Sequence, residues 1–299
     1  MRLEKYVQLA ENELFTVADL RRWGSSRFAA ADLDFSQGQQ NPRAEADLIL
    51  ARALHLEPED LADFSGARLL PEEKRRVLQH FYAREILRRP AAYITGEAWF
   101  AGLRFMVDER VLIPRSLIEP FIEEGFAPWV EESRIQRILE IGTGSGCMAI
   151  TLALRFPYAE IDAVDISLEA LNVARSNVQK YRLEEQVHLY QSDLFSALQG
   201  QRYDLVISNP PYVDAAAMAE LPPEYTHEPR LALAAGTDGL DCLLPLLEQA
   251  PRHLEAGGVL IVETGDAEVA LSEQRPDLPL IWLEHPAGGS GVFLMTFNG

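Results

Sequence analysis

The chain of 299 residues contains only two cysteines, Cys147 and Cys242, and neither belongs to a CxxC pair. The two lie far apart in sequence, so they do not suggest a disulfide framework, and a structural zinc site needs several closely spaced thiolate or imidazole ligands. The six histidines are scattered without the spacing of metal ligands. The sequence therefore predicts neither a disulfide nor a metal site.

Long hydrophobic runs are also missing. No stretch approaches the roughly 18 uninterrupted apolar residues that a membrane-spanning helix requires. The opening segment, MRLEKYVQLAENEL, is charged and lacks the apolar core of a secretory signal peptide. From these absences we expect a soluble, cytoplasmic protein that has no membrane partner.

Basic residues are few, with 27 Lys and Arg against 46 Asp and Glu, so the formal net charge is −19. Such a field repels the phosphates of nucleic acids and favours encounters with a basic partner. The hydrophobic content of 47% is typical of a chain that buries a core. We expect a folded protein whose direct substrate is not a nucleic acid.

Residues 1–90 carry the signals of a small helical domain. Thr16 and Asp19 precede the run LRRWGSSRFAAA, Asn41 and the proline after it begin PRAEADLILARAL, and Pro71 stands in the first turn of PEEKRRVLQHFYAREILRR. Polar N-caps and a proline in the first turn are typical helix starts.

The pattern changes at Pro90. Residues 91–116 contain aromatic and β-branched runs, with Gly96 and Gly102 as turn residues. This segment predicts a β-hairpin that connects the helical domain to the remainder of the chain.

Residues 117–299 predict an α/β domain. Short apolar runs alternate with helical segments, which indicates a mostly parallel sheet with helices on both faces. The last two runs, PLIWLE and VFLMTF, have no helix between them and predict an antiparallel pair at the sheet edge. The other expected strands are RILEI, EIDAVDI, VHLYQ, YDLVI and GGVLIVET.

A glycine-rich turn, LEIGTGSG, follows the first of these strands and contains Gly142, Gly144 and Gly146. Glycine permits a positive φ and the close approach of a ligand to the backbone, beyond the carboxyl ends of the strands. The spacing is GxGxG, which does not favour a nicotinamide dehydrogenase because the dinucleotide fingerprint is GxGxxG.

The next two strands also end in carboxylates. Asp165 follows the second strand, where it can accept hydrogen bonds from ribose hydroxyls, or alternatively cap the next helix, as Ser167 also could. Asp193 follows the third strand and can accept from an exocyclic amine such as that of adenine, while Leu194 and Phe195 cover the purine face. Together these strand ends predict a site for an adenosine-bearing cofactor.

The fourth strand ends in Asn209, Pro210, Pro211 and Tyr212. The two prolines fix φ and lack the backbone N–H, so the loop is rigid and offers carbonyl acceptors. Alone, a proline pair after a buried strand can also be a simple chain break.

In this order, EIGTGSG, Asp165, SDLF and NPPY resemble the class I S-adenosylmethionine-dependent methyltransferases that methylate amino groups, over about residues 137–297. The resemblance implies a Rossmann-like sheet, with S-adenosyl-L-methionine as cofactor and S-adenosyl-L-homocysteine as product. By the same resemblance the cofactor-binding residues are Glu140, Gly142, Thr143, Gly144, Gly146, Asp165, Asp193, Leu194, Phe195 and Asn209.

The same resemblance implies the role of the NPPY loop. An amide nitrogen is a poor nucleophile, and the Asn209 side-chain oxygen and the Pro210 carbonyl would hold its two N–H groups while Tyr212 stacks on the planar group. The expected catalytic residues are thus Asn209, Pro210 and Tyr212, and Pro211 adds to the substrate site.

A second resemblance covers almost the whole chain. The helical domain, the connector PAAYITGEAWFAGLRFMVDERVLIPRS, NPPY and EYTHEPRLALAAGTDGL are similar to the protein glutamine N5-methyltransferase family. It implies that the helical domain recognises the substrate and that Phe100 lines the glutamine pocket. From its residue type, Phe100 could equally be a core aromatic of the hairpin. Arg115 would brace the pocket or pair with an acid, and Glu228 and Pro229 would support the structure.

This family has two branches, which methylate either peptide-chain release factors or large-subunit ribosomal protein L three. LFTVADLRRWGSSRFAAADLDF and IPRSLIEP resemble the ribosomal-protein branch, whereas the other branch usually has IPRPETE. QGQQNPRAEA departs from the GHGTDNPWDEA-like run of the expected branch and leaves the partner-recognition surface open.

The expected function is therefore methylation of a glutamine in ribosomal protein L three, a basic protein, before or during ribosome assembly. Three alternatives stay open at this stage: a release-factor glutamine methyltransferase, a nucleic-acid amino-group methyltransferase, and a non-catalytic module that only binds its partner.

Overall fold

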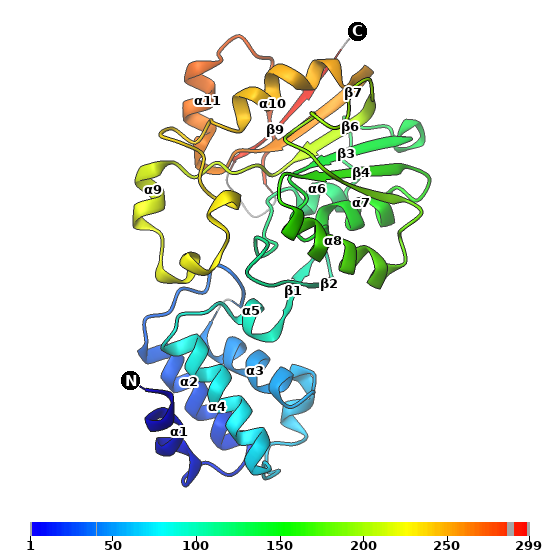
Figure 1. Cartoon of the computed structure of the whole chain (residues 1–299). Coiled ribbons are helices and arrows are strands. Elements are labelled where there is room, and N and C mark those ends of the chain that lie inside the picture. Colours follow the sequence, from blue (N-terminus) through cyan, green and yellow to red (C-terminus); the bar gives the residue numbers. More distant parts are fainter. Residues whose placement is uncertain (1, 40, 286–289, 298–299) are drawn as a thin grey trace. The chain divides into compact units, whose positions relative to one another are not determined.

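The computed structural model describes residues 2–39, 41–285 and 290–297. Contacts divide them into two units, and Figure 1 labels most of their helices and strands. The helical unit comprises Met1–Glu97 together with Pro222–His227, and the sheet unit comprises Ala98–Leu221 and Glu228–Gly299.

The helical unit confirms the helix starts predicted from the sequence. The Thr16 hydroxyl accepts from the backbone N–H of Asp19, whose carboxylate accepts from the N–H of Thr16, and the Asn41 side chain caps the next helix. Neither the first helix nor the short one after Pro90 was predicted. The helices are α1 (Leu3–Glu11), α2 (Val17–Ala30), α3 (Pro42–Ala53), α4 (Pro71–Glu85) and α5 (Ala91–Thr95), with 3-10 turns η1 (Pro58–Ala62) and η3 (Pro223–His227).

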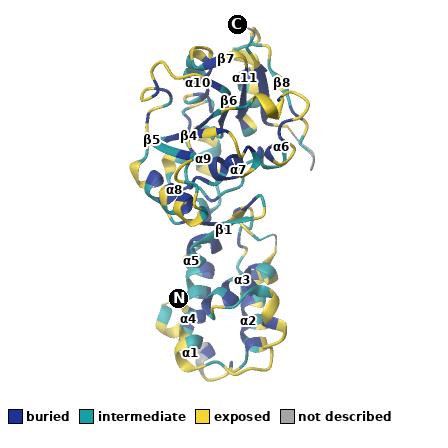
Figure 2. Cartoon of the chain, turned by 90° about the vertical axis from the view of Figure 1, so that its right-hand side faces the viewer, coloured by how far each residue is buried: buried dark blue, intermediate teal, exposed yellow. Residues whose placement is uncertain are grey.

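Buried apolar side chains of α2, α3 and α4 make up much of the core of this unit. Figure 2 colours the buried residues along these helices dark blue. Gly24 lets α2 approach α4 closely, because a Cβ atom there would lie 2.5 Å from the Phe81 ring. That ring is fully buried and has an edge-to-face contact with Phe28. A glycine inside the helix therefore provides the space for a large core aromatic.

The predicted hairpin is confirmed as β1 (Glu97–Phe100) and β2 (Leu103–Met106). Ala101 and Gly102 turn the chain between them with φ values of +48° and +70°. The predicted connector of residues 91–116 is nevertheless divided, because α5 and Glu97 group with the helical unit.

The sheet unit contains a seven-stranded sheet of order β5-β4-β3-β6-β7-β9-β8. The first five of these strands are parallel to their neighbours, whereas β9 runs antiparallel to both β7 and β8. This confirms the predicted mostly parallel sheet with an antiparallel pair at its edge. The strands are β3 (Arg137–Ile141), β4 (Glu160–Asp165), β5 (Val187–Gln191), β6 (Tyr203–Ser208), β7 (Leu254–Glu263), β8 (Ile281–Trp282) and β9 (Val292–Thr296).

Helices cover both faces of this sheet, and each face has its own apolar core. Residues of α7 (Cys147–Arg155) and α8 (Leu168–Tyr181) pack on one face, and those of α10 (Leu243–Gln249) and α11 (Glu268–Gln274) pack on the other. No helix within the described ranges is both long and apolar enough to cross a membrane. The remaining helical elements are α6 (Glu119–Glu123), α9 (Ala215–Glu220), η2 (Glu132–Arg134), η4 (Arg230–Ala232), η5 (Ala250–Arg252) and η6 (Gly265–Ala267).

The close approach at Gly24 gives a first prediction. Gly24→Ala improves intrinsic helix propensity, yet it should destabilise the protein by about 1–3 kcal/mol because the new methyl group overpacks the core against Phe81. Urea unfolding followed by circular dichroism measures the change. Gly66→Ala is the matched control, since a Cβ atom at Gly66 meets no atom within 4 Å. Equal effects of the two substitutions would contradict the packing explanation.

Candidate active site

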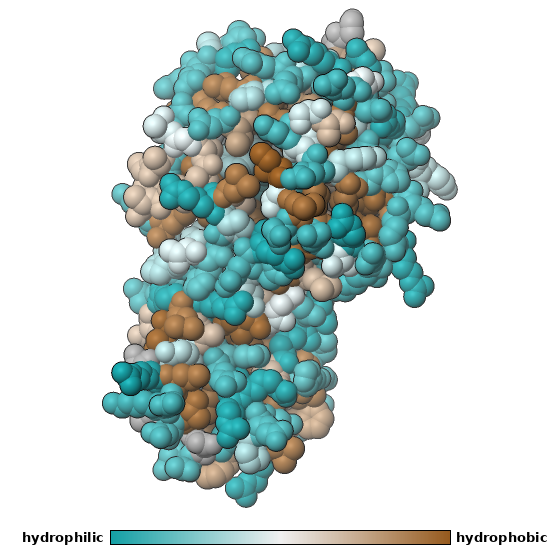
Figure 3. All heavy atoms as spheres, viewed as in Figure 1, coloured by the Kyte–Doolittle hydropathy of each residue, from teal (hydrophilic) through white to brown (hydrophobic). Residues whose placement is uncertain are grey.

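A cavity of about 200 Å³ lies at the carboxyl ends of β3, β4, β5 and β6, entirely within the sheet unit. On the face shown in Figure 3, hydrophilic residues surround a group of apolar ones in this unit. The cavity is lined by Arg110, Val111, Leu112, Ile141, Gly142, Gly144, Asp165, Ile166, Ser167, Ala170, Ser192, Asp193, Leu194, Ser208, Asn209, Pro210, Pro211, Pro229, Leu231, Ala232 and Cys242.

The glycine turn forms one wall, and all three of its glycines have positive φ. The backbone N–H groups of Gly142 and Thr143 donate to the Val164 carbonyl at 2.9 and 3.0 Å, which ties the turn to β4. A Cβ atom at Gly144 would meet no atom within 4 Å, so the backbone is open toward the cavity there. Gly146 lies away from the cavity, where a Cβ atom would be 3.2 Å from Ala174 in α8.

Asp165 connects this turn to the start of α8. Its Oδ2 accepts from the N–H of Gly144 at 2.9 Å, and its Oδ1 accepts from the N–H of Ser167 at 2.8 Å. Ser167 itself caps α8 by accepting from Ala170, so the alternative reading of Asp165 as the helix cap is wrong. Burial raises the pKa of Asp165. Each carboxylate oxygen still has a lone pair available to a ligand hydroxyl.

The segment after β5 brings Asp193 and Leu194 to the cavity, as the sequence predicted. Ser192 fixes it, because its hydroxyl donates to the Leu194 carbonyl at 2.7 Å and accepts from the N–H of Ala197 at 3.0 Å. Phe195 does not line the cavity: it is buried and stacks on His253 with ring centroids 4.5 Å apart.

Asn209, Pro210 and Pro211 also line the cavity, at the carboxyl end of β6. The hydroxyl of Ser208 donates to the Ile141 carbonyl at 2.8 Å, which holds the ends of β3 and β6 together. The Asn209 carbonyl lies 3.8 Å from the place of a Cβ atom on Gly142. Within the described part of the chain we find no hydrogen-bond partner for the side-chain amide of Asn209, a residue that lines the cavity.

Tyr212 does not line the cavity, although the sequence predicted that it stacks on the substrate. Its hydroxyl donates to Glu263 Oε1 at 3.0 Å, and its ring fills the place that a Cβ atom on Gly265 would need. Glu263 is buried and also accepts from the Ser116 hydroxyl at 2.6 Å and the Leu117 N–H at 2.8 Å. Tyr212 thus braces the loop from the core side.

Glu140 and Thr143 lie beneath the glycine turn. The Thr143 hydroxyl donates to Glu140 Oε2 at 2.6 Å, and Glu140 is only 1% exposed. Burial raises the pKa of Glu140 to about 8. These two predicted cofactor residues therefore support the turn and do not face the cavity.

Phe100 is also placed away from the cavity. It is 1% exposed and belongs to the apolar core that includes Phe105, Ile118 and Phe121. The sequence left two interpretations of Phe100 open, and its position in the structure is that of a core aromatic.

Two stretches of the cavity wall were not predicted: Arg110–Leu112 and Pro229–Ala232. Glu228 joins them, because its carboxylate accepts from Arg115 Nη1 at 2.9 Å and from the N–H of Ile113 at 3.2 Å. Arg115 thus pairs with an acid, one of its two expected roles. Both stretches lie in segments that carried the family resemblance, but no residue type in them signals a cofactor.

The titratable groups of the site do not form a metal centre. Within residues 2–39, 41–285 and 290–297, no group of three or more His, Cys, Asp or Glu side chains is placed to hold a metal ion. The polar side chains that line the cavity are carboxylates, hydroxyls, one amide and one guanidinium, which can form hydrogen bonds to a polar ligand such as a nucleoside.

Two protein-family models match the chain. One described as "Methyltransferase small domain" matches residues 126–223, and one described as "PrmC N-terminal domain" matches residues 19–96. The two matches fall in the sheet unit and the helical unit respectively, apart from a few residues at the edges.

Curated relatives cover nearly the whole chain. A ribosomal protein uL3 glutamine methyltransferase of Bordetella pertussis is 46% identical over 285 residues, which is 95% of this chain and 96% of the relative. The protein of the same name from Neisseria meningitidis serogroup B is 46% identical over 288 residues, 96% of this chain and 95% of the relative.

Among solved structures, the hMettl16 catalytic domain in complex with a MAT2A 3'UTR hairpin has a TM-score of 0.50 at 16% identity. The match covers 76% of this chain and 81% of that chain. At this identity the likeness concerns the fold alone.

The buried Glu140 gives a prediction on pH. Because its pKa is raised from 4.5 to about 8, the folded state keeps a proton that the unfolded state has lost. Its contribution to the free energy of unfolding is therefore full below about pH 4.5 and is lost as the pH rises to about 8. Urea unfolding at several pH values should show the wild type losing a few kcal/mol relative to Glu140→Gln over this interval.

The comparison of the two proteins removes the effect of the other buried carboxyl groups, since Glu45, Asp165 and Glu263 titrate in both. A free-energy difference that stays constant from pH 4.5 to 8 would mean that Glu140 is charged in the folded protein.

Proposed function

The chain belongs to the family of the ribosomal protein uL3 glutamine methyltransferases, and on this basis we propose that it methylates the side-chain amide nitrogen of a glutamine in uL3 with S-adenosylmethionine. It is a methyltransferase. The identity of 46% along 95% of the chain is the observation that carries the proposal, because it includes the helical unit as well as the sheet unit.

The residues of the cavity fit S-adenosylmethionine. The open backbone at Gly144 admits a ligand close to the turn, and Asp165 can accept from ribose hydroxyls. Asp193 can accept from the adenine amine, with Ile166 and Leu194 against the faces of the purine. When bound, S-adenosylmethionine supplies a methyl group on a positively charged sulfur that leaves as the neutral thioether S-adenosylhomocysteine.

The loop at Asn209 acts on the substrate amide. The lone pair of a carboxamide nitrogen is delocalised into the carbonyl, so the nitrogen is a poor nucleophile. The Asn209 side-chain oxygen and the Pro210 carbonyl each accept one N–H of the substrate and turn its lone pair toward the methyl group. Holding the reacting groups in this way supplies several kcal/mol of the rate enhancement. Tyr212 keeps these acceptors in place through its hydrogen bond to the buried Glu263.

The charge of the chain supports a basic protein as substrate. The net charge is −19, and the most basic stretch, in α4 and just beyond it, does not form a basic surface. Lys74 and Arg84 are buried, and of the six Lys and Arg residues between positions 73 and 89 only Arg75 is exposed. This disfavours the alternative of a nucleic-acid methyltransferase.

We propose that uL3 is captured in the cytoplasm before or during ribosome assembly. An acidic enzyme attracts a basic ribosomal protein while that protein is not yet covered by RNA, and this attraction speeds the encounter. Electrostatic capture of this kind weakens as the ionic strength rises.

Labelled S-adenosylmethionine tests the proposed function directly. The full chain is incubated separately with purified uL3, a release factor and ribosomal RNA, and the labelled product is digested and sequenced by mass spectrometry. We expect one methylated glutamine in uL3 and a rate that falls as salt is added. Label only in the release factor or in RNA would assign the activity to one of the alternatives.

Two substitutions test the roles in the site. Asn209→Ala should lower kcat by about 10²–10³-fold, as the loss of a preorganised transition-state contact does, and change the Kd of S-adenosylmethionine only slightly. Asp165→Ala should raise that Kd, because it removes the ribose acceptor and frees the glycine turn. Calorimetric titration gives Kd, and initial rates with uL3 give kcat. A raised Kd in Asn209→Ala together with a lowered kcat alone in Asp165→Ala would contradict the roles assigned to these two residues.

A further inference from the structure

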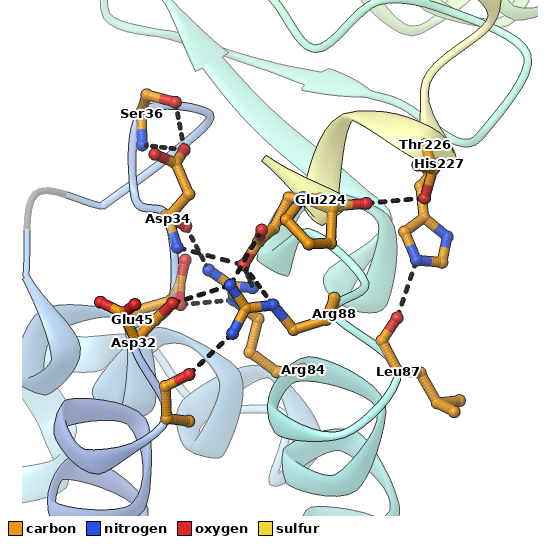
Figure 4. A network of polar contacts seen from close by, with 12 residues as sticks. Asp32, Asp34, Ser36, Glu45, Arg84, Leu87, Arg88, Glu224, Thr226 and His227 are labelled. Atoms are coloured by element: carbon orange, nitrogen blue, oxygen red, sulfur yellow. Dashed lines mark hydrogen bonds and ion pairs between the residues drawn. The ribbon is translucent and has the colours of Figure 1, made fainter. Parts of the chain in front are cut away.

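The segment Pro222–His227 belongs to the helical unit, although the sequence on both sides of it belongs to the sheet unit. Figure 4 shows Glu224, Thr226 and His227 of this segment in a polar network whose other members come from residues before position 98 of the helical unit. The chain thus leaves the sheet unit after Leu221, forms η3 in the helical unit, and returns at Glu228.

Glu224 is the centre of this attachment. Its side chain is completely buried, and its Oε1 accepts from Arg84 Nη1 at 3.0 Å and from the N–H of Asp34 at 3.1 Å. The same oxygen forms an ion pair with Arg88, whose Nε lies 3.0 Å away. Its Oε2 accepts from Arg88 Nη2 at 3.3 Å. Two guanidinium groups and one backbone donor therefore hold a single carboxylate out of water.

The arginines need this carboxylate for charge balance. Arg84 is 1% exposed and also donates to Glu45 Oε2 at 2.6 Å and to the Asp34 carbonyl. Arg88 donates to the carbonyls of Ala31 and Asp32, both at 2.7 Å. Among these residues, two cations thus face the two carboxylates of Glu45 and Glu224, and one carboxylate of the pair comes from the inserted segment. Removing one partner of a buried ion pair is strongly unfavourable.

The rest of the segment is attached as well. The hydroxyl of Tyr225 shares a hydrogen bond of 2.9 Å with Ser36, and His227 Nε2 donates to the Leu87 carbonyl at 2.9 Å. The attachment thus extends to the last residue before the chain returns to the sheet unit.

Covalent continuity links this attachment to the cavity. Asn209–Pro211 precede the segment and line the cavity, and Pro229, Leu231 and Ala232 follow it and line the cavity too. Only Glu228 stands between His227 and Pro229, and a chain spans at most about 3.6 Å per residue. The helical unit is therefore connected to the Pro229–Ala232 wall through a single intervening residue.

We infer that Glu224 is a positioning residue, which fixes the Pro229–Ala232 wall of the cofactor cavity by attaching the inserted segment to the helical unit. The inference rests on the proposed binding of S-adenosylmethionine in this cavity. It predicts that the attachment to the helical unit controls the affinity for the cofactor. A substrate that binds the helical unit would then change the affinity for the cofactor, and the cofactor would change the affinity for the substrate.

Two variants of the full chain test this role by calorimetric titration with S-adenosylmethionine in the absence of uL3. Glu224→Gln removes the buried charge, and two glycines inserted between His227 and Glu228 lengthen the link without changing any side chain. Both should raise the Kd by about tenfold, within the range usual for coupling between distant sites. Initial rates should show a raised KM for S-adenosylmethionine and a kcat within a few-fold of the wild type.

Matched controls separate positioning from stability. Glu85→Gln alters another buried carboxylate of the helical unit, which accepts from Tyr6 at 2.6 Å and Arg27 at 3.0 Å but does not contact the segment. Two glycines between Val130 and Glu131 lengthen a loop within the sheet unit. Neither should change the Kd, and thermal melting of every variant checks that it is folded.

An unchanged Kd in the folded insertion variant would overturn the inference even if Glu224→Gln failed to fold. A Kd that rises equally with Glu85→Gln would also overturn it, since general loosening of the helical unit would then be the cause. Failure of the proposed function looks different: the wild type would not bind S-adenosylmethionine, or would bind it and leave uL3 unmodified.

Discussion

The two hydrogen bonds that Asp165 accepts, from Gly144 and Ser167, are the interaction on which the cavity depends. Strand ends leave backbone N–H groups without partners, and a glycine turn has no side chains to satisfy them. A carboxylate accepts several donors at once, so one side chain at the end of β4 fixes the turn after β3 and the start of α8. Glu263 accepts from Tyr212 of the NPPY loop in a similar way. Glu228 accepts from Arg115 and from the N–H of Ile113, next to the Arg110–Leu112 wall. Buried acids thus act here as fixed acceptors for loops.

This arrangement explains which parts of the site could be predicted from the sequence. The strands and their carboxyl ends follow from apolar periodicity, and parallel strands bring their ends to one edge of the sheet. Gly142, Gly144, Asp165, Asp193 and Asn209 were therefore placed correctly at a common cavity. The direction of a side chain after a strand end depends on partners far away in sequence. Tyr212 turns toward Glu263, a residue of β7, and nothing near Tyr212 in the sequence indicates that partner.

Domain membership and the exposure of charged residues are also hard to predict from the sequence, because both depend on contacts between residues far apart in the chain. The helix starts of the N-terminal region were predictable because capping is local, within three residues of Thr16 or Asn41. The insertion of Pro222–His227 into the helical unit was not, because the donors for Glu224 lie on α4, on its C-terminal extension and in the loop after α2. Equally, the basic run in α4 reads as a candidate basic surface until Arg84 and Arg88 are seen to face carboxylates.

The ion pairs that attach Pro222–His227 to the helical unit also have a cost in free energy. Burying Arg84 together with Glu45 and Glu224 removes charges from water, and such ion pairs seldom gain stability over apolar packing of the same volume. Burial raises the pKa of Glu45 to about 7, so this carboxyl binds a proton more readily than an exposed one. A carboxylate shared between two guanidinium groups and a backbone N–H makes directional contacts, so it fixes the orientation of the segment. The network therefore fixes the orientation of this segment at a cost in stability, and residues that precede and follow the segment in the sequence line the cavity.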